Sequence, residues 1–317
     1  MTATRRDLIK LSSAGLAGVG LAACGSGHTT HIDKPAFVLV HGAWHGAWTW
    51  QKVVPELAQQ GYCSLAIDLP GHGLNAKFPS SYLERPLNAA NFATEVSSVA
   101  SVTVDQCADA VIAAVEQLRS GGFEKVIVVA HSAGGIAVTQ AVERIPSKVA
   151  AVVYLSAFML DNGQSALAAT ALPEGATGQV PLLLKADPAV VAALRIDSAS
   201  NESAYLSQIK STFYGDVADS ELPAIRNLLT PDSPIALGVT PTSKTAAGWG
   251  SVRRHYNKCT QDSAIPPALQ QKFIDTADAS SPMNKTVVQS LNASHSPFFS
   301  VPKNLADTLS SIARSLP

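Results

Sequence analysis

Cysteine is scarce in this chain, with four residues among 317, and one of them, Cys24, lies near the N-terminus. The remaining three, Cys63, Cys107 and Cys259, cannot form a disulfide framework, and their spacings match no metal site. Each lies in or beside an apolar segment, which favours a small buried side chain. We therefore expect no disulfide framework, no metal and no cofactor.

Charged residues are few as well, and neither sign prevails. They make up 15% of the chain, 23 basic and 24 acidic, for a net charge of −1. Removal of residues 1–23 would delete three basic residues and one acidic residue, leaving 20 and 23 and a net charge of −3. This balance suggests no nucleic-acid partner and no polybasic attachment to a membrane.

The N-terminus lacks an apolar run long enough to span a membrane, but it has the features of an export signal. A twin arginine, Arg5-Arg6, precedes a weakly apolar run at residues 11–23. The Leu-Ala-Ala that ends this run, followed by Cys24, is similar to the bacterial lipobox, in which cleavage leaves cysteine as a lipidated first residue. We expect residues 1–23 to be a twin-arginine signal peptide and residues 24–34 a tether. The mature protein would be an exported bacterial lipoprotein of the periplasm or cell envelope, with its lipid anchor as its only membrane contact.

From residue 35 the chain alternates apolar β-branched runs with helical patterns. The former predict buried strands and the latter helices, and their alternation indicates a mostly parallel sheet with helices on both faces. A hydrophobic content of 46% suffices for the core of one α/β domain. Strands are expected at residues 36–40, 62–67, 126–130, 149–155, 252–260 and 286–291, and helices at residues 50–60, 103–121, 136–144, 268–276 and 301–315.

This alternation is interrupted twice. Residues 74–102 are irregular and polar, and residues 158–249 combine many alanines and prolines with short helical patterns but no clear buried strand. A long insertion between core strands is usually functional, and here it would cap the carboxyl edge of the sheet, where open α/β folds bind ligands. Residues 35–317 are thus expected to form one domain with a cap at about 158–249. Phe158 and Trp249, at the ends of the cap, are candidates for an apolar pocket wall or for hinge packing.

The central motif is a strand, a sharp turn with a serine at its tip, and a helix. Residues 126–130 form the strand, Ser132 follows, and residues 136–144 have a helical pattern. Such a turn requires small residues two positions either side of the serine, here Ala130 and Gly134. Ser132 is therefore predicted to be a catalytic nucleophile on a nucleophile elbow. The alternative is an ordinary strand-to-helix turn that contains a serine.

A serine nucleophile needs a base, and the base needs a group that orients it. His295 lies in a loop after the last strand, at the same sheet edge as Ser132, and is the expected base. Asp262, after the penultimate strand, is preferred as the acid to Asp161, which is also explained as the polar start of the insertion. His131 adjoins the serine, but on a strand its side chain would point away from it.

Ester hydrolysis also needs two backbone amides placed to stabilise the oxyanion. The amide of Ala133 lies at the N-terminus of the elbow helix, where the helix dipole favours negative charge. The amide of Ala43, in the turn after the first strand, is the second candidate, and Gly42 lets the backbone bend toward the site. We predict that these two amides form the oxyanion hole.

These motifs resemble the α/β-hydrolase superfamily, and more narrowly the branch of plant methylesterases and hydroxynitrile lyases with their bacterial esterase relatives. The resemblance implies Ser132, Asp262 and His295 as the triad and the amides of Ala43 and Ala133 as the oxyanion hole. Together the motifs specify the fold and the triad but not a substrate. They span nearly all of the chain after the tether, at residues 37–48, 68–73, 130–134, 157–161, 249–252, 259–262 and 295–299.

Because this branch also contains lyases, the reaction class depends on two positions. The lyases carry a threonine after the histidine of the first loop and a lysine after the catalytic histidine, where this chain has Gly42 and Ser296. The resemblance therefore favours hydrolysis, through an acyl-enzyme, of carboxylic esters of small apolar or aromatic molecules. The alternatives are cyanohydrin cleavage and a non-catalytic ligand-binding lipoprotein on the same fold. An epoxide or haloalkane hydrolase is disfavoured because its elbow nucleophile is an aspartate.

Overall fold

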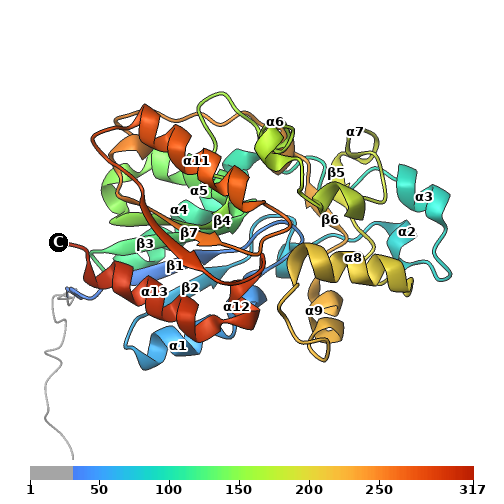
Figure 1. The fold of residues 1–317 in the computed structure, drawn as a ribbon, viewed down its shortest axis with the longest axis horizontal. Coiled ribbons are helices and arrows are strands. Elements are labelled where there is room, and N and C mark those ends of the chain that lie inside the picture. The colour runs from blue at the N-terminus through green and yellow to red at the C-terminus, as the bar shows by residue number, and fades with distance from the viewer. Residues whose placement is uncertain (1–30) are drawn as a thin grey trace, which may run out of the picture. The chain divides into compact units, whose positions relative to one another are not determined.

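A six-stranded parallel sheet forms the centre of the domain (Figure 1). The computed structural model describes residues 31–317, so the signal expected at residues 1–23 and most of the tether lie outside the described residues. The strand order is β2-β1-β3-β4-β7-β8, which places β3 in the interior of the sheet. The strands are β1 (Ala36–Val40), β2 (Ser64–Ile67), β3 (Val126–Ser132), β4 (Ala151–Ala157), β7 (Arg254–Cys259) and β8 (Val287–Leu291).

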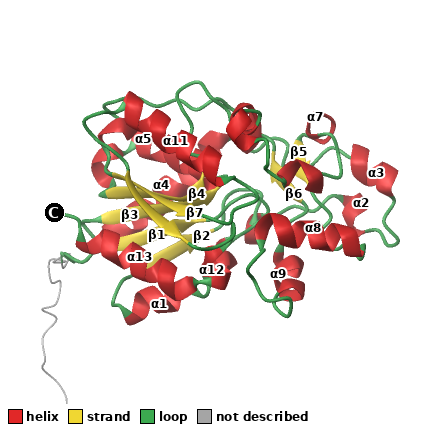
Figure 2. Cartoon of the chain, in the orientation of Figure 1, coloured by secondary structure: helices red, strands yellow, loops and turns green. Residues whose placement is uncertain are grey.

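Helices cover both faces of this sheet, with α4, α5 and α11 on one face and α1 and α13 on the other (Figure 2). The start of α4 is fixed by a capping box, in which Thr103 and Gln106 each bond to the other's backbone amide. None of the described helices is both long and apolar enough to cross a membrane. The covering helices are α1 (Val53–Gln59), α4 (Val104–Ser120), α5 (Gly134–Arg144), α11 (Pro267–Ser280) and α13 (Pro302–Arg314), with the short α12 (Pro297–Ser300) before the last.

The central strands are buried from end to end, because helices cover both of their faces. Every residue of β1 and β4 is buried, as are all residues of β3 before Ser132. This is why these strands appear in the sequence as continuous apolar runs rather than alternating ones. The predicted α/β-hydrolase fold with a mostly parallel sheet is confirmed. One smaller expectation is wrong: Cys63 is exposed, since it precedes the edge strand β2, whereas Cys107 and Cys259 are buried.

A second, smaller layer connects β4 to β7 and corresponds to the insertion expected as a cap. It contains a two-stranded antiparallel sheet of β5 (Ala193–Arg195) and β6 (Asp232–Pro234). The expectation of no buried strand here is wrong, because strands of three residues are too short to give a recognisable pattern. The helices of this segment are α6 (Ala166–Thr170), α7 (Pro188–Val191), α8 (Ser203–Phe213), α9 (Leu222–Leu228) and α10 (Ala236–Val239).

The segment between β2 and α4 also joins this layer, although the sequence indicated only irregular structure there. It forms α2 (Ser80–Leu83) and α3 (Ala89–Thr94), which lie beside α7 and β5 in Figure 1. A buried arginine makes the connection. Arg195 donates to the backbone carbonyls of Phe92 and Glu95, at 2.5 and 2.8 Å, and to both carboxylate oxygens of Asp232, at 2.7 Å each. Both side chains of this ion pair are fully buried.

Asp232→Ala should lower the free energy of unfolding by about 3–5 kcal/mol, because it leaves a buried guanidinium without its counter-ion. Urea denaturation followed by circular dichroism measures the change. Glu221→Ala is the control: it removes the partly exposed Lys52–Glu221 pair and should cost less than about 1 kcal/mol. Equal losses in the two variants would show that the buried pair does not hold this layer together.

Candidate active site

The turn between β3 and α5 has the strained backbone of a nucleophile elbow. Ser132 has a φ of 52°, a left-handed conformation that is uncommon for residues other than glycine. Crowding also explains the residues around it. A Cβ atom at Gly134 would lie 2.4 Å from the carbonyl oxygen of His41, so only glycine fits there. Ala130, two positions before the serine, is fully buried, and its methyl group is accommodated beside Val40 of the neighbouring strand.

The structure brings Asp262, and not Asp161, to the predicted base. His295 Nδ1 lies 2.7 Å from Asp262 Oδ2, and both side chains are buried. The other carboxylate oxygen accepts hydrogen bonds from the amides of Ala264 and Ile265, at 2.7 and 2.9 Å. Asp161 instead lies at the surface with its carboxylate 3.9 Å from the ammonium group of Lys244. This contact orients the His295 ring through Nδ1, and Nε2 has no hydrogen-bond partner among residues 31–317, the Ser132 hydroxyl included.

A residue that the sequence did not single out completes the surroundings of the carboxylate. The Ser156 hydroxyl donates to Asp262 Oδ2, the oxygen that also binds His295. Ser156 is fully buried, has a φ of 39°, and lies where the pairing of β3 with β4 shifts by one residue. The Gln270 side-chain amide also donates to Oδ2, at 3.4 Å, so two backbone amides, a side-chain amide, a hydroxyl and an imidazole surround the Asp262 carboxylate. No sequence signal marks this serine, because its contact depends on a strand neighbour far along the chain.

The histidine beside the serine supports the base rather than the nucleophile. His131 is fully buried and its Nε2 lies 2.9 Å from the carbonyl oxygen of His295. A carbonyl only accepts, so this nitrogen carries the proton. Burial first, and then the charge on a protonated His295, lower the pKa of His131 well below its ordinary value. His131 is thus a neutral donor that holds the backbone of the loop carrying His295.

A second neutral histidine orients the peptide that contains the Ala43 amide. His41 Nε2 accepts a hydrogen bond from the Leu69 amide at 3.0 Å, so Nδ1 is the protonated nitrogen and donates to the Gly42 carbonyl at 2.7 Å. In a trans peptide the C=O and N–H groups point in opposite directions. Because the Gly42 carbonyl is held by His41, the Ala43 N–H points away from that ring.

The amides of Ala43 and Ala133 are free for a ligand. Neither donates to a protein acceptor within residues 31–317, and both residues line one cavity together with Ser132. Gly42 allows this approach, since a Cβ atom there would lie 2.6 Å from Ser132 Cβ. The structure thus places the serine and both predicted amide donors on the wall of a single cavity.

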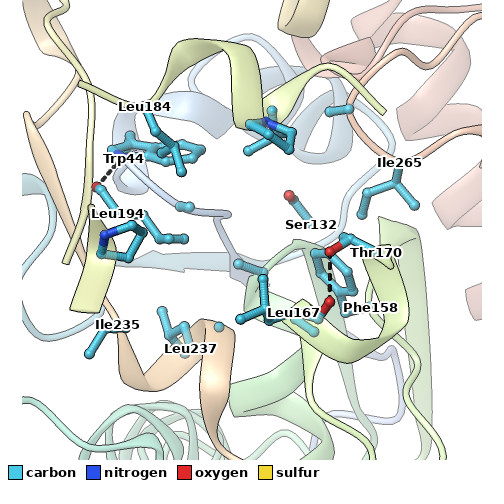
Figure 3. Close-up of a pocket in the computed structure, with 18 of the residues that line it drawn as sticks. Trp44, Ser132, Phe158, Leu167, Thr170, Leu184, Leu194, Ile235, Leu237 and Ile265 are labelled. Carbon is cyan, nitrogen blue, oxygen red and sulfur yellow. Dashed lines mark hydrogen bonds between the residues drawn. The ribbon is translucent and has the colours of Figure 1, made fainter. Parts of the chain in front are cut away.

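The cavity has a volume of about 150 Å³, and no charged side chain of residues 31–317 lines it. Its walls come from the cap, from the turn after β1, and from Ala264 and Ile265 beside the acid (Figure 3). Phe158 is part of the wall, as one of its two predicted roles required. Trp249 instead packs at the junction between the cap and the core. Its indole N–H donates to the Tyr154 hydroxyl at 2.7 Å, and the cationic groups of Lys244 and Arg254 lie over its ring. Within residues 31–317 no group of three or more histidine, cysteine or acidic side chains is arranged to hold a metal ion.

The fold and this site define an α/β hydrolase. A model of the alpha/beta hydrolase family matches residues 37–308, so the chain belongs to that family. It is 33% identical to putative methylesterase 11 of Arabidopsis thaliana over 90% of this chain and 66% of that protein. It is 30% identical to methylesterase 9 of the same plant over 89% of this chain and 99% of that protein. The resemblance to the methylesterase branch is confirmed.

Solved structures agree on the fold at lower sequence identity. A pyrethroid hydrolase from Sphingobium faniae has a TM-score of 0.69 and 21% identity, covering 90% of this chain and 98% of that one. A methylesterase from Arabidopsis has a TM-score of 0.62 and 22% identity, covering 89% of this chain and 99% of that one. The domain architecture is therefore shared by enzymes whose sequences have diverged widely.

The buried neutral histidines should make the protein sensitive to acid. Burial lowers the pKa of His41 to about 4 and that of His45 to about 3, whereas histidine in an unfolded chain titrates near 6.5. Between these values the unfolded chain binds more protons than the native one. The free energy of unfolding should therefore fall as the pH falls, by up to about 1.4 kcal/mol per pH unit for each histidine.

Urea denaturation at intervals from about pH 7 to 5 measures this slope above the range in which most carboxylates titrate. His45→Gln should make the slope shallower, because one proton fewer is taken up on unfolding. A slope of zero in the parent protein over this interval would contradict the assignment of these histidines as neutral.

Proposed function

We propose that the chain is a serine esterase that hydrolyses small, neutral carboxylic esters with an apolar or aromatic group. One observation carries the proposal. The candidate nucleophile Ser132 and the two free amides open onto one uncharged cavity. The residue before the serine, His131, donates a hydrogen bond to the backbone of His295, which is paired with the buried Asp262. Carboxylic ester hydrolysis also agrees with the names of the related proteins, which are methylesterases.

The chemistry follows from the positions of these groups. His295 Nε2 takes the proton of Ser132 as its oxygen attacks the ester carbonyl, and Asp262 stabilises the imidazolium that forms. The amides of Ala43 and Ala133 donate to the oxyanion of the tetrahedral intermediate. His295 then gives its proton to the departing alcohol, leaving an acyl group on Ser132. Water then gives a proton to the same imidazole and attacks the acyl carbonyl. The bond between Ser132 and the acyl group breaks, the carboxylic acid leaves, and the serine takes its proton back from His295.

The cavity supports the substrate class. A cavity of about 150 Å³ with apolar walls, both aliphatic and aromatic, is large enough for a benzene ring. Among the described lining residues, Ser132 and Thr170 are the two with a hydroxyl, and that of Thr170 already donates to the Leu167 carbonyl at 2.9 Å. The indole N–H of Trp44 is likewise used, by the Leu194 carbonyl. A charged substrate group would lose its hydration here without gaining a partner. Esters with an aromatic or branched aliphatic group fit this environment best.

Two observations weigh against the alternatives. Cyanohydrin cleavage in the lyases of this branch depends on a lysine next to the catalytic histidine. Here that position is Ser296, which is fully buried, and no lysine of residues 31–317 lines the cavity. A purely ligand-binding protein needs no acid–base pair. The orientation of His295 by Asp262, Ser156 and His131 is of use to a proton-transfer catalyst and brings no benefit to a receptor.

The triad assignment is tested with a chromogenic ester of a small aromatic alcohol. Ser132→Ala should abolish turnover, and Asp262→Asn should lower kcat by about 10⁴, because the imidazole loses its orienting charge. Asp161→Asn is the matched control at the other candidate acid and should change kcat little. Loss of activity in Asp161→Asn but not in Asp262→Asn would move the acid to the end of β4. Release of cyanide from mandelonitrile that is fast and lost in Ser132→Ala would identify a lyase.

We also propose that residues 1–23 are a twin-arginine export signal and that Cys24 carries a lipid. The motifs at the N-terminus support this, together with the start of the domain soon after them: Ile32 already pairs with Phe123. A tether of this length would keep the esterase at the surface of the membrane that holds the lipid.

Cys24→Ser should prevent lipidation and shift the protein from the membrane fraction to the soluble fraction of a bacterial host. Mass spectrometry of the parent protein should find a diacylglyceryl cysteine at its N-terminus. Recovery of soluble parent protein with residues 1–23 still attached would overturn the proposal, and esterase activity should be the same in both forms.

A further inference from the structure

The turn that carries the Ala43 amide holds a tryptophan in a backbone conformation that favours glycine. Gly42, Ala43, Trp44 and His45 form a tight turn, in which the His45 amide lies 3.4 Å from the Gly42 carbonyl oxygen. Trp44, the third residue, has a φ of 62°. Bulky side chains are disfavoured in this left-handed region of the backbone. A residue keeps such a strained conformation only where several surrounding contacts hold it there. The cause of this conformation must lie outside the turn.

The cap supplies those contacts. The Trp44 carbonyl accepts a hydrogen bond from the Thr230 amide at 2.9 Å, and the Trp44 indole N–H donates to the Leu194 carbonyl at 2.8 Å (Figure 3). Leu194 belongs to β5, and Thr230 precedes β6. The indole ring also packs against Phe213 of α8, with ring centroids 5.7 Å apart. Trp44 is therefore held by the backbone of the cap on two sides.

A second link joins the cap to the other side of Ala43. The Tyr214 hydroxyl lies 2.7 Å from His45 Nε2, and His45 Nδ1 lies 2.7 Å from the Ala43 carbonyl oxygen. The carbonyl accepts, so Nδ1 is protonated and Nε2 accepts from the hydroxyl. Burial lowers the pKa of His45 to about 3 and raises the pKa of Tyr214, so both groups stay neutral at working pH. Tyr214 follows α8 and does not line the cavity.

We propose that Trp44 and Tyr214 are positioning residues through which the cap sets the oxyanion hole. Both peptides that flank Ala43 are held: His41 fixes the Gly42 carbonyl, and His45, itself held by Tyr214, fixes the Ala43 carbonyl. The direction of the Ala43 N–H thus depends on the seating of the cap. This inference rests on the proposed function, since it assigns a role to groups around the amide that would bind the oxyanion.

The contacts of Trp44 and Tyr214 also connect substrate binding to the proposed oxyanion hole. Leu194 lines the cavity with its side chain while its carbonyl binds Trp44, and Phe213 lines the cavity next to Tyr214 in the chain. An ester group that fills the cavity packs against the same cap segments that hold the turn. Such an ester should be turned over with a higher kcat than a short acetate, and not only with a lower KM. Its binding energy also stabilises the cap in the position that holds the turn with the Ala43 amide.

Tyr214→Phe is the sharpest test, because it removes one oxygen atom that touches neither the cavity nor the serine. We expect kcat for a cavity-filling ester to fall about tenfold with KM nearly unchanged. The fall should be smaller than the loss of about 10²–10³ in kcat that follows removal of a whole oxyanion donor, because the Ala43 amide is still present. Trp44→Phe, which keeps an aromatic ring but loses the N–H to Leu194, should lower kcat similarly. Affinity for a trifluoromethyl ketone, which forms an oxyanion on the serine, should fall in parallel in both variants.

Trp48→Phe is the matched control. Trp48 follows in the short 3-10 helix Ala47–Trp50, where its ring stacks on that of His45. Its indole nitrogen is buried with no hydrogen-bond partner among residues 31–317, so phenylalanine keeps an aromatic ring beside His45 and removes no bond to the cap. Its kcat and its affinity for the ketone should stay within about twofold of the parent values. Thermal denaturation of each variant identifies any that fail to fold.

The proposal is overturned if folded Tyr214→Phe and Trp44→Phe keep the kcat and ketone affinity of the parent protein. It is equally overturned if the losses appear only in KM, or if Trp48→Phe loses as much as they do. Ser132→Ala separates this failure from failure of the proposed function. If Ser132→Ala still turns over the ester, the serine mechanism is wrong, whereas an inactive Ser132→Ala beside unaffected Tyr214 and Trp44 variants rejects only the link to the cap.

Discussion

Close contact between two backbone turns is the constraint on which the rest of this site depends. The turn after β1 and the elbow after β3 approach so closely that neither has room for a side chain at the contact. A Cβ atom would lie 2.4 Å from a backbone oxygen at Gly134 and 2.6 Å from Ser132 Cβ at Gly42. The parallel register of β1 and β3 brings the two turns to the same edge of the sheet. Ala43 and Ala133, whose amides are the proposed oxyanion donors, therefore line the same cavity although they come from different turns.

Neutral histidines hold the groups around this contact in place. His41, His45 and His131 are all buried, and each donates a hydrogen bond to a backbone carbonyl of a loop in the site. An ammonium or guanidinium donor in the same positions would carry a large desolvation cost, and it would place a positive charge beside the base. A neutral imidazole donates without that cost, and in His41 and His45 the second ring nitrogen also accepts a hydrogen bond. As a consequence, the free energy of unfolding should fall in acid, whereas at neutral pH these histidines do not reduce it.

The sequence was sufficient to predict the strands of the sheet, the elbow and the α/β-hydrolase class. Those features depend on short-range patterns: β-branched runs, small residues around Ser132, and a loop histidine after the last strand. The sequence also favoured Asp262 over Asp161, and the structure places Asp262 against His295. The contacts of Ser156 with Asp262 and of Arg195 with Asp232 could not be predicted in this way. Each pairs residues far apart in the chain, with no spacing rule to connect them.

The strain at Trp44 belongs to the same class, and it changes how the cap is understood. From the sequence the cap was expected to supply a pocket wall, which would affect which ester binds. In the structure the segments of the cap that line the cavity also hold the turn that presents the Ala43 amide. A wall that served only for binding would have no need of backbone hydrogen bonds to a strained residue next in the chain to the proposed oxyanion donor. In this fold the choice of substrate and the stabilisation of the transition state share one set of contacts, so evolution of the cap toward a new ester would alter both together.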